Sequence, residues 1–110
     1  MSKMGAWKTA TLTATTVSAE IDLGRDFARV LVLVPDLGVS ADVTITLAKE
    51  SGGTFYPLYR LDGDSAASLE GITSADQVAK AIIFPCGVQF IKILASASQT
   101  SETFYVRGMD

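Results

Sequence analysis

The side chains best suited to metal chemistry lie in one short acidic segment that contains Asp62 and Asp64. Carboxylates at this spacing could bind Ca²⁺, which prefers oxygen ligands. The established calcium loop needs further oxygen ligands, a glycine and a late glutamate. Here Ala66 and Ala67 stand where the loop requires an oxygen ligand and a glycine, although Glu70 follows. Aspartate and glycine in such a segment more often form turns, so we expect no metal site.

Catalytic groups are scarce in the rest of the chain. There is no histidine and a single cysteine, Cys86, so Ser-His and Cys-His pairs and a zinc site cannot be assembled. Acids such as Glu20 and Asp22 could supply the paired carboxylates of a glycosidase, but they alternate with apolar residues as on the solvated face of a strand. We therefore predict a non-enzymatic protein without a cofactor.

Aromatic residues offer better candidates for binding. Tyr56, Tyr59 and Tyr105 sit beside or near other aromatics, so some of these rings must leave the core side of a strand. An outward tyrosine buries its ring in an interface while its hydroxyl finds a partner. Trp7 precedes the regular pattern and could fold back on its own sheet or anchor in a neighbour, and we expect the neighbour.

Charge and composition exclude several partners. The net charge is −3 and the basic residues are scattered singly, so we expect no binding to nucleic acid or to anionic lipid. No apolar run approaches the ~20 residues that span a bilayer, and we expect neither a signal peptide nor a membrane segment. Apolar residues form 48% of the chain and charged residues 19%, so part of the apolar surplus is expected to face a partner.

A periodicity of two dominates the chain and predicts strands. Residues 17–23 and 43–47 alternate as strands with one wet face, whereas 27–34 is a nearly continuous apolar run typical of a strand covered on both faces. Further strands are expected over 54–61, with Pro57 at an edge, and over 82–84, 88–95 and 103–107. Turns are expected at 24–26, 50–53 and 96–101.

One helix is possible in the stretch with least strand character, residues 62–77. Ser74 and Gln77 have the spacing of a capping box, which would begin a short helix running through Lys80.

This pattern predicts an all-β fold, a small antiparallel β-sandwich with at most one short helix. A jelly roll is the first choice of topology and an immunoglobulin-like sandwich the alternative. We expect residues 1–16 to form an extended arm or edge strand and residues 17–110 to form the sandwich domain.

Four segments carry a resemblance to a known family. They are Ile21–Phe27 leading into a strand that ends at Pro35, then Ser51–Tyr56, Phe84–Ile93 and Thr103–Gly108. Their order resembles that of small head proteins of tailed bacteriophages, in particular the jelly-roll cement (decoration) proteins of epsilon15-like short-tailed phages. The likeness in size and strand layout covers nearly the whole chain.

The resemblance implies a structural virion protein, made in the host cytoplasm and bound to the outer capsid surface, that bridges major capsid subunits and does no chemistry. Self-association into dimers or trimers on the capsid would accompany this role. The contact residues are predicted from the sequence itself: Trp7, Tyr56, Tyr59, Asp62, Asp64, Tyr105 and Arg107.

Two other functions remain open at this point. A carbohydrate-binding jelly roll would stack an exposed aromatic ring such as Tyr56 on a sugar. A phage tail or adaptor subunit could share the same sandwich.

Overall fold

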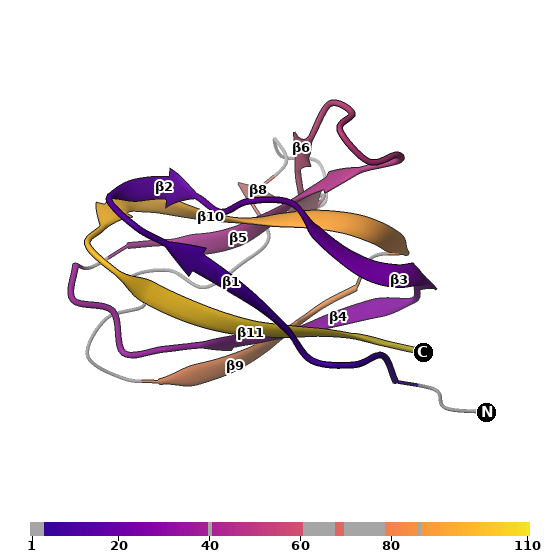
Figure 1. Cartoon of the computed structure of the whole chain (residues 1–110), viewed down its shortest axis with the longest axis horizontal. Helices are drawn as coiled ribbons and strands as arrows, with labels where there is room; N and C mark the ends of the chain where they lie inside the picture. The colour runs from indigo at the N-terminus through magenta and orange to yellow at the C-terminus, as the bar shows by residue number, and fades with distance from the viewer. Residues whose placement is uncertain (1–3, 40, 61–67, 70–78, 86) are drawn as a thin grey trace.

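The computed structural model describes residues 4–39, 41–60, 68–69, 79–85 and 87–110, which form two antiparallel sheets packed face to face (Figure 1). Sheet A has the order β1 (Lys8–Leu12), β11 (Glu102–Met109), β4 (Arg29–Val34) and β9 (Lys80–Phe84). Sheet B has the order β2 (Thr15–Val17), β10 (Val88–Gln99), β5 (Val43–Ala48) and β6 (Tyr56–Pro57), and β3 (Ile21–Phe27) also pairs with β10. A small separate pair joins β7 (Tyr59–Arg60) to β8 (Ser68–Leu69).

The order of pairing is that of a jelly roll. Strand β1 pairs with β11, β2 and β3 pair with β10, β4 pairs with β9, and β5 pairs with β6. Early strands thus meet late strands in reverse order, as when one long hairpin is wrapped into two sheets. The predicted all-β sandwich is confirmed, and the topology is the jelly roll rather than the immunoglobulin-like alternative.

Helical structure is absent from the described residues. Most of the helix predicted from Ser74 lies outside them, but its expected last residue, Lys80, begins strand β9. Within the described part of the chain no helix has the length and apolar character needed to cross a bilayer.

The core lies between the two sheets. Alternate residues of each strand point inward, which follows from the period of two. The largest fully buried side chains include Phe84, Phe104, Ile45, Ile91 and Ile93. Each such side chain stabilises the fold by roughly 1.5–3 kcal/mol when it leaves water, so the sandwich rests on this inner layer.

Strand β10 is longer than the sequence predicts. Residues 96–99 were expected in a turn, but β10 continues to Gln99. The polar side chains that suggested a turn bind the backbone of the β4–β5 connection instead: Ser96 Oγ accepts a hydrogen bond from the Asp42 amide at 2.8 Å. The buried Gln99 amide donates to Val39 O at 2.9 Å and accepts from Val39 N at 3.3 Å.

Strand β3 likewise runs through residues 24–26, where a turn was expected. Gly24 has a φ of 98°, and the pairing of β3 with β10 shifts register between Val88 and Phe90. The glycine therefore marks an irregularity within the strand, a bulge-like feature for which a positive φ is required.

Residues 8–17 take part in both sheets. Strand β1 is an edge strand of sheet A, and its side chains Ala10 and Leu12 are buried in the core. The boundary expected after residue 16 falls inside β2, at the edge of sheet B. Strands β1 and β2 of this segment are edge strands rather than a free arm. Removal of the segment would expose the core.

Glu20 holds the turn between β5 and β6. Its carboxylate accepts hydrogen bonds from the Gly52 amide at 2.8 Å and from the Ser51 hydroxyl at 2.7 Å. The Gly52 amide, and next the Ser51 hydroxyl, lower the pKa of Glu20 below its usual value of 4.5. The charged form of Glu20 is thus favoured in the folded protein.

The Glu20→Gln variant should be less stable than the parent protein at neutral pH, with a gap that closes in acid. A lowered folded pKa makes the stabilisation complete above the unfolded pKa and removes it as pH falls through the folded pKa. Urea unfolding of both proteins between about pH 3 and pH 7 measures the difference. A difference that stays constant over this range would show that the carboxylate charge does not matter.

Phe27 closes one end of the sandwich against two glycines. A Cβ atom on Gly108 would lie 2.0 Å from Phe27 Cδ2, and one on Gly5 would lie 2.8 Å from Phe27 Cζ. The ring is 4% exposed, and the Arg25 guanidinium lies 3.9 Å from the ring centroid on its outer side. The absence of side chains at both glycines makes the space that the ring fills.

Gly108→Ala should therefore destabilise the fold by about 1–3 kcal/mol, as overpacked cores do. Gly87→Ala is the matched control, since its Cβ would have Phe27 O as nearest neighbour at an ordinary 3.7 Å. Chemical denaturation gives both values. Equal effects of the two substitutions would contradict the close packing of Phe27 on Gly108.

Candidate protein-binding face

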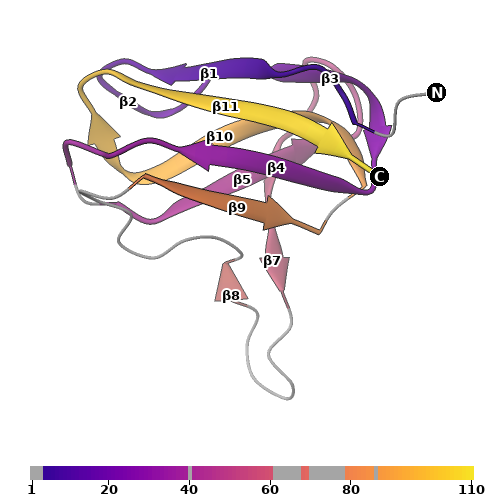
Figure 2. The same ribbon diagram turned by 90° about the horizontal axis from the view of Figure 1, so that it is seen from below.

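Alternate residues of sheet A point away from the core and form the outer face of sheet A. Because directly opposite residues share a face, the strand register aligns them in rows. One row runs Thr9, Tyr105, Leu33, Ala81, and the next runs Arg107, Leu31, Ile83. Figure 2 shows the four strands side by side in front of sheet B, with no labelled strand across them.

This face is apolar although it is exposed. Leu33 is 37% exposed, Tyr105 47% and Ile83 50%. An antiparallel sheet with one solvated face normally carries polar residues there. The run over 27–34 was predicted to be covered on both faces; among the described residues, β4 is covered by sheet B on its inner face alone. Cover for the other face would have to come from outside the described residues.

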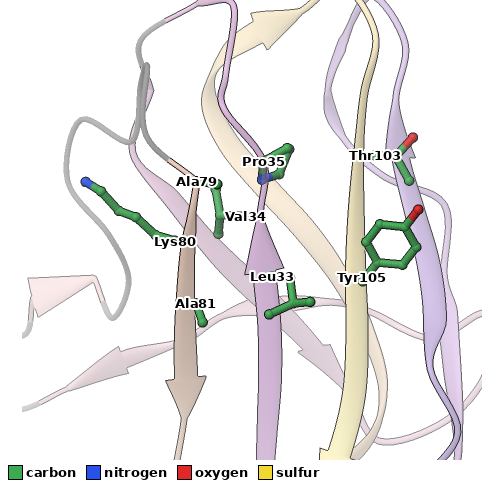
Figure 3. Close-up of a pocket in the computed structure, with 8 residues that line it drawn as sticks. All are labelled: Leu33, Val34, Pro35, Ala79, Lys80, Ala81, Thr103 and Tyr105. Atoms are coloured by element: carbon green, nitrogen blue, oxygen red, sulfur yellow. The ribbon is translucent and has the colours of Figure 1, made fainter.

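A shallow hollow of about 330 Å³ lies on this face where β4, β9 and β11 meet. Figure 3 shows Leu33 between Tyr105 and Ala81 on three neighbouring strands, with the Lys80 side chain directed away. The described residues that line it are Leu33, Val34, Pro35, Ala79, Lys80, Ala81, Thr103 and Tyr105. The hollow therefore offers mainly carbon surface, suited to an apolar side chain of a partner.

Trp7 and Arg107 occupy the other end of the face. The chain before β1 continues along β11, with the Gly5 amide bonded to Gly108 O at 2.9 Å. Arg107 donates from Nε and Nη2 to Gly5 O at 3.0 and 2.8 Å, and its guanidinium lies 4.8 Å from the Trp7 ring centroid. Trp7 thus packs against its own sheet, yet 44% of it stays exposed. Trp7 therefore folds back on its own sheet and still has exposed surface with which to contact a neighbouring protein.

The charged side chains that point outward from the four strands are cations. The register assigns Arg29 and Arg107 to this side, and no aspartate or glutamate of these strands shares it. Asp110, just beyond β11, forms an ion pair with Arg25 at 2.7 Å, which raises the pKa of Arg25. The local charge of the face is opposite in sign to the net charge of −3.

The outer face of sheet B differs from that of sheet A. Thr44 and Thr46 point outward from β5 but are buried. Next to them Lys92 lies 4.4 Å from the Phe55 ring centroid. This part of sheet B is therefore shielded by the chain, whereas Leu33, Ile83 and Tyr105 of sheet A are exposed in the described structure.

The predicted contact residues fall into three groups. Trp7, Tyr105 and Arg107 lie on the outer face of sheet A, although Trp7 comes from the opposite end of the sequence to the other two. Tyr56 is exposed at the far edge of sheet B. Tyr59 contributes backbone to β7, whereas Asp62 and Asp64 lie outside the described residues.

Sequence reasoning did not single out Leu31, Leu33 and Ile83 as outward-facing residues of sheet A. It placed Leu31 and Leu33 in a strand covered on both faces, and it placed Ile83 in a strand without assigning it a face. The signal was nevertheless present, because a strand apolar on both sides needs cover on both sides and a chain of this size supplies few layers.

Within the described residues no three histidine, cysteine, aspartate or glutamate side chains gather closely enough to hold a metal ion. Comparisons of the chain with known protein families, curated proteins and solved structures found no match.

Substitutions at two neighbouring residues of β4 should distinguish the buried side of sheet A from its exposed side by their effects on stability. Val32→Thr puts a hydroxyl into the core and should cost about 1–3 kcal/mol, because Val32 is fully buried. Leu33→Thr should change the free energy of unfolding by about 0.5 kcal/mol or less, as exposed positions do. Denaturant unfolding measures both, and a loss at position 33 as large as at 32 would contradict an open face.

Proposed function

We propose that this protein is a non-enzymatic structural subunit that attaches to another protein through the outer face of sheet A. The observation that carries the proposal is the exposed apolar row across β11, β4 and β9. Tryptophan, tyrosine and arginine are the residues that most often dominate binding energy, and Trp7, Tyr105 and Arg107 lie together on this face.

The proposed setting is the outside of a phage capsid, where the protein acts as a cement between major capsid subunits. The jelly-roll order of strands supports this setting because it is the fold implied by the resemblance of the four sequence segments. A cement protein needs a rigid scaffold and adhesive surfaces, and it needs no catalytic group.

The size of the face favours a repeated assembly over a solitary pair. Strands about 4.8 Å apart and about 3.3 Å per residue give this side of the sheet roughly 20 Å by 20 Å, or about 400 Å² in projection. A standard interface buries about 800 Å² on each partner. One such face therefore binds weakly alone, whereas several contacts on a closed lattice strengthen each other through effective concentration.

The chemistry of the hollow favours a protein over a sugar. Carbohydrate sites combine a stacking ring with several hydrogen-bonding side chains, and apart from Thr103, Tyr105 and Lys80 this hollow is lined by aliphatic residues. An apolar side chain of a protein matches that lining better.

The test is the binding of face variants to capsids of the virus that encodes the chain. Leu33→Asp and Ile83→Asp should each reduce co-sedimentation with shells depleted of the protein at least tenfold, since a carboxylate would be buried in an apolar contact. Val17→Asp is the matched control, because Val17 is similarly exposed at 39% but belongs to β2 of sheet B.

All three variants should keep the parental melting temperature, which confirms that the fold is intact. The parent protein should occur in purified particles at a fixed ratio to the shell protein. A parent protein that does not bind shells would overturn the proposal, as would face variants that bind as well as the control.

A further inference from the structure

We infer that Arg107 receives an aspartate or glutamate carboxylate from the partner protein, at the edge of an otherwise apolar contact. This inference rests on the proposed function, because it describes the partner that would cover the outer face of sheet A. The partner surface would then be apolar with a carboxylate at the position facing Arg107.

The guanidinium of Arg107 is held in place before any partner arrives. Its Nε and Nη2 donate to the single acceptor Gly5 O at 3.0 and 2.8 Å, and the Trp7 ring lies beside it at 4.8 Å. These contacts use one side of the planar group and leave Nη1 without a hydrogen bond in the described structure. A fixed guanidinium loses less rotamer freedom on binding than a mobile one, so it suits recognition of a carboxylate.

No carboxylate of the described residues neutralises Arg107. Asp110, the nearest acid along the chain, is bound by Arg25 through two contacts at 2.7 and 3.3 Å. Glu102, at the opposite end of β11, accepts a hydrogen bond from the Gly38 amide at 2.9 Å. The charge of Arg107 is therefore available to a partner.

The surroundings of Arg107 select a protein carboxylate over a nucleic acid phosphate. Its neighbours in the same row are Leu31 and Ile83, and Tyr105 precedes it on the same face. Phosphate backbones are bound by several cations that follow a strip of surface. The outward cations of the four strands are Arg29 and Arg107, and Arg29 already donates to Asp110 O. Arg107 among apolar side chains instead matches a single acidic residue in a largely apolar protein surface.

A second copy of the chain is a poor occupant for this face. Two copies related by a two-fold axis would bring the same patch together. The outward charged side chains of its strands are Arg29 and Arg107, and the nearby Asp110 is already bound by Arg25 through its side chain and by Arg29 through its backbone oxygen. Like charges in a desolvated contact oppose binding. Charge complementarity therefore favours a different protein.

Carbodiimide coupling on the particle tests the contact directly. Arg107→Lys keeps the positive charge and supplies an amine that couples only to a carboxylate in contact with it. We expect a cross-link from position 107 to an aspartate or glutamate of the shell protein, located by mass spectrometry. Arg25→Lys controls for the coupling chemistry, because its amine should link to Asp110 of the same chain.

Affinity measurements complete the test and include one that needs no variant. Binding of the parent protein to shells should weaken several-fold between about 50 mM and about 500 mM NaCl, since salt screens a charge pair at the edge of the contact. Arg107→Met should bind at least tenfold more weakly and lose most of that salt dependence. Its melting temperature reports whether the Gly5 contact is needed for folding.

Each outcome decides one of the two proposals. A parent protein that binds shells without salt dependence, or Arg107→Met that binds as the parent does, would overturn the carboxylate contact and leave attachment through sheet A standing. A cross-link from position 107 to a second copy would overturn the choice of partner. Absence of any binding to shells would overturn the proposed function and this inference with it.

Discussion

In a sandwich of two sheets each strand can bury only one of its faces between the sheets, and its other face needs cover from elsewhere. Strand β4 is apolar on both faces. Its inward residues Val30, Val32 and Val34 fill the core, while Leu31 and Leu33 point to the other side. No rearrangement of the two layers can hide both sets, because a shift of one residue would exchange them. The open apolar face is thus a consequence of the sequence of β4 combined with a two-layer fold. Strand β9 repeats the situation with Ile82 and Ile83.

At the end of the molecule beside this face, the contacts that pack the sandwich also fix the position of the Arg107 guanidinium. Gly5 and Gly108 leave room for the Phe27 ring, which ties β3 of sheet B to β11 of sheet A. The same Gly5 presents its carbonyl to Arg107 and keeps the guanidinium beside Trp7. Packing inside the sandwich and the geometry outside it are therefore coupled through one short stretch of backbone.

Period-two patterning was sufficient to predict the sandwich, because each strand carries its inward residues at alternate positions. It failed at Ser96 and Gln99, whose side chains bind the backbone of the β4–β5 connection, a tertiary partner that no local pattern reveals. Trp7, Tyr105 and Arg107 were identified by residue type, but their common location depends on the register of β1 with β11. Register between strands so distant in sequence is set by the whole core.

The exposure of Leu33, which lies in the run predicted to be covered on both faces, carries the most information for the proposed function. An apolar run predicts cover without saying whether the cover belongs to the same chain. The open face retains a hydrophobic driving force, since apolar area exposed in the monomer leaves water on binding. Exposed apolar faces also favour indiscriminate association. A fixed arginine in the row limits this, because burying its charge is costly unless the partner supplies a carboxylate. In the proposed interface, adhesion would thus come from Leu33 of β4 and Ile83 of β9, and selectivity from Arg107 of β11.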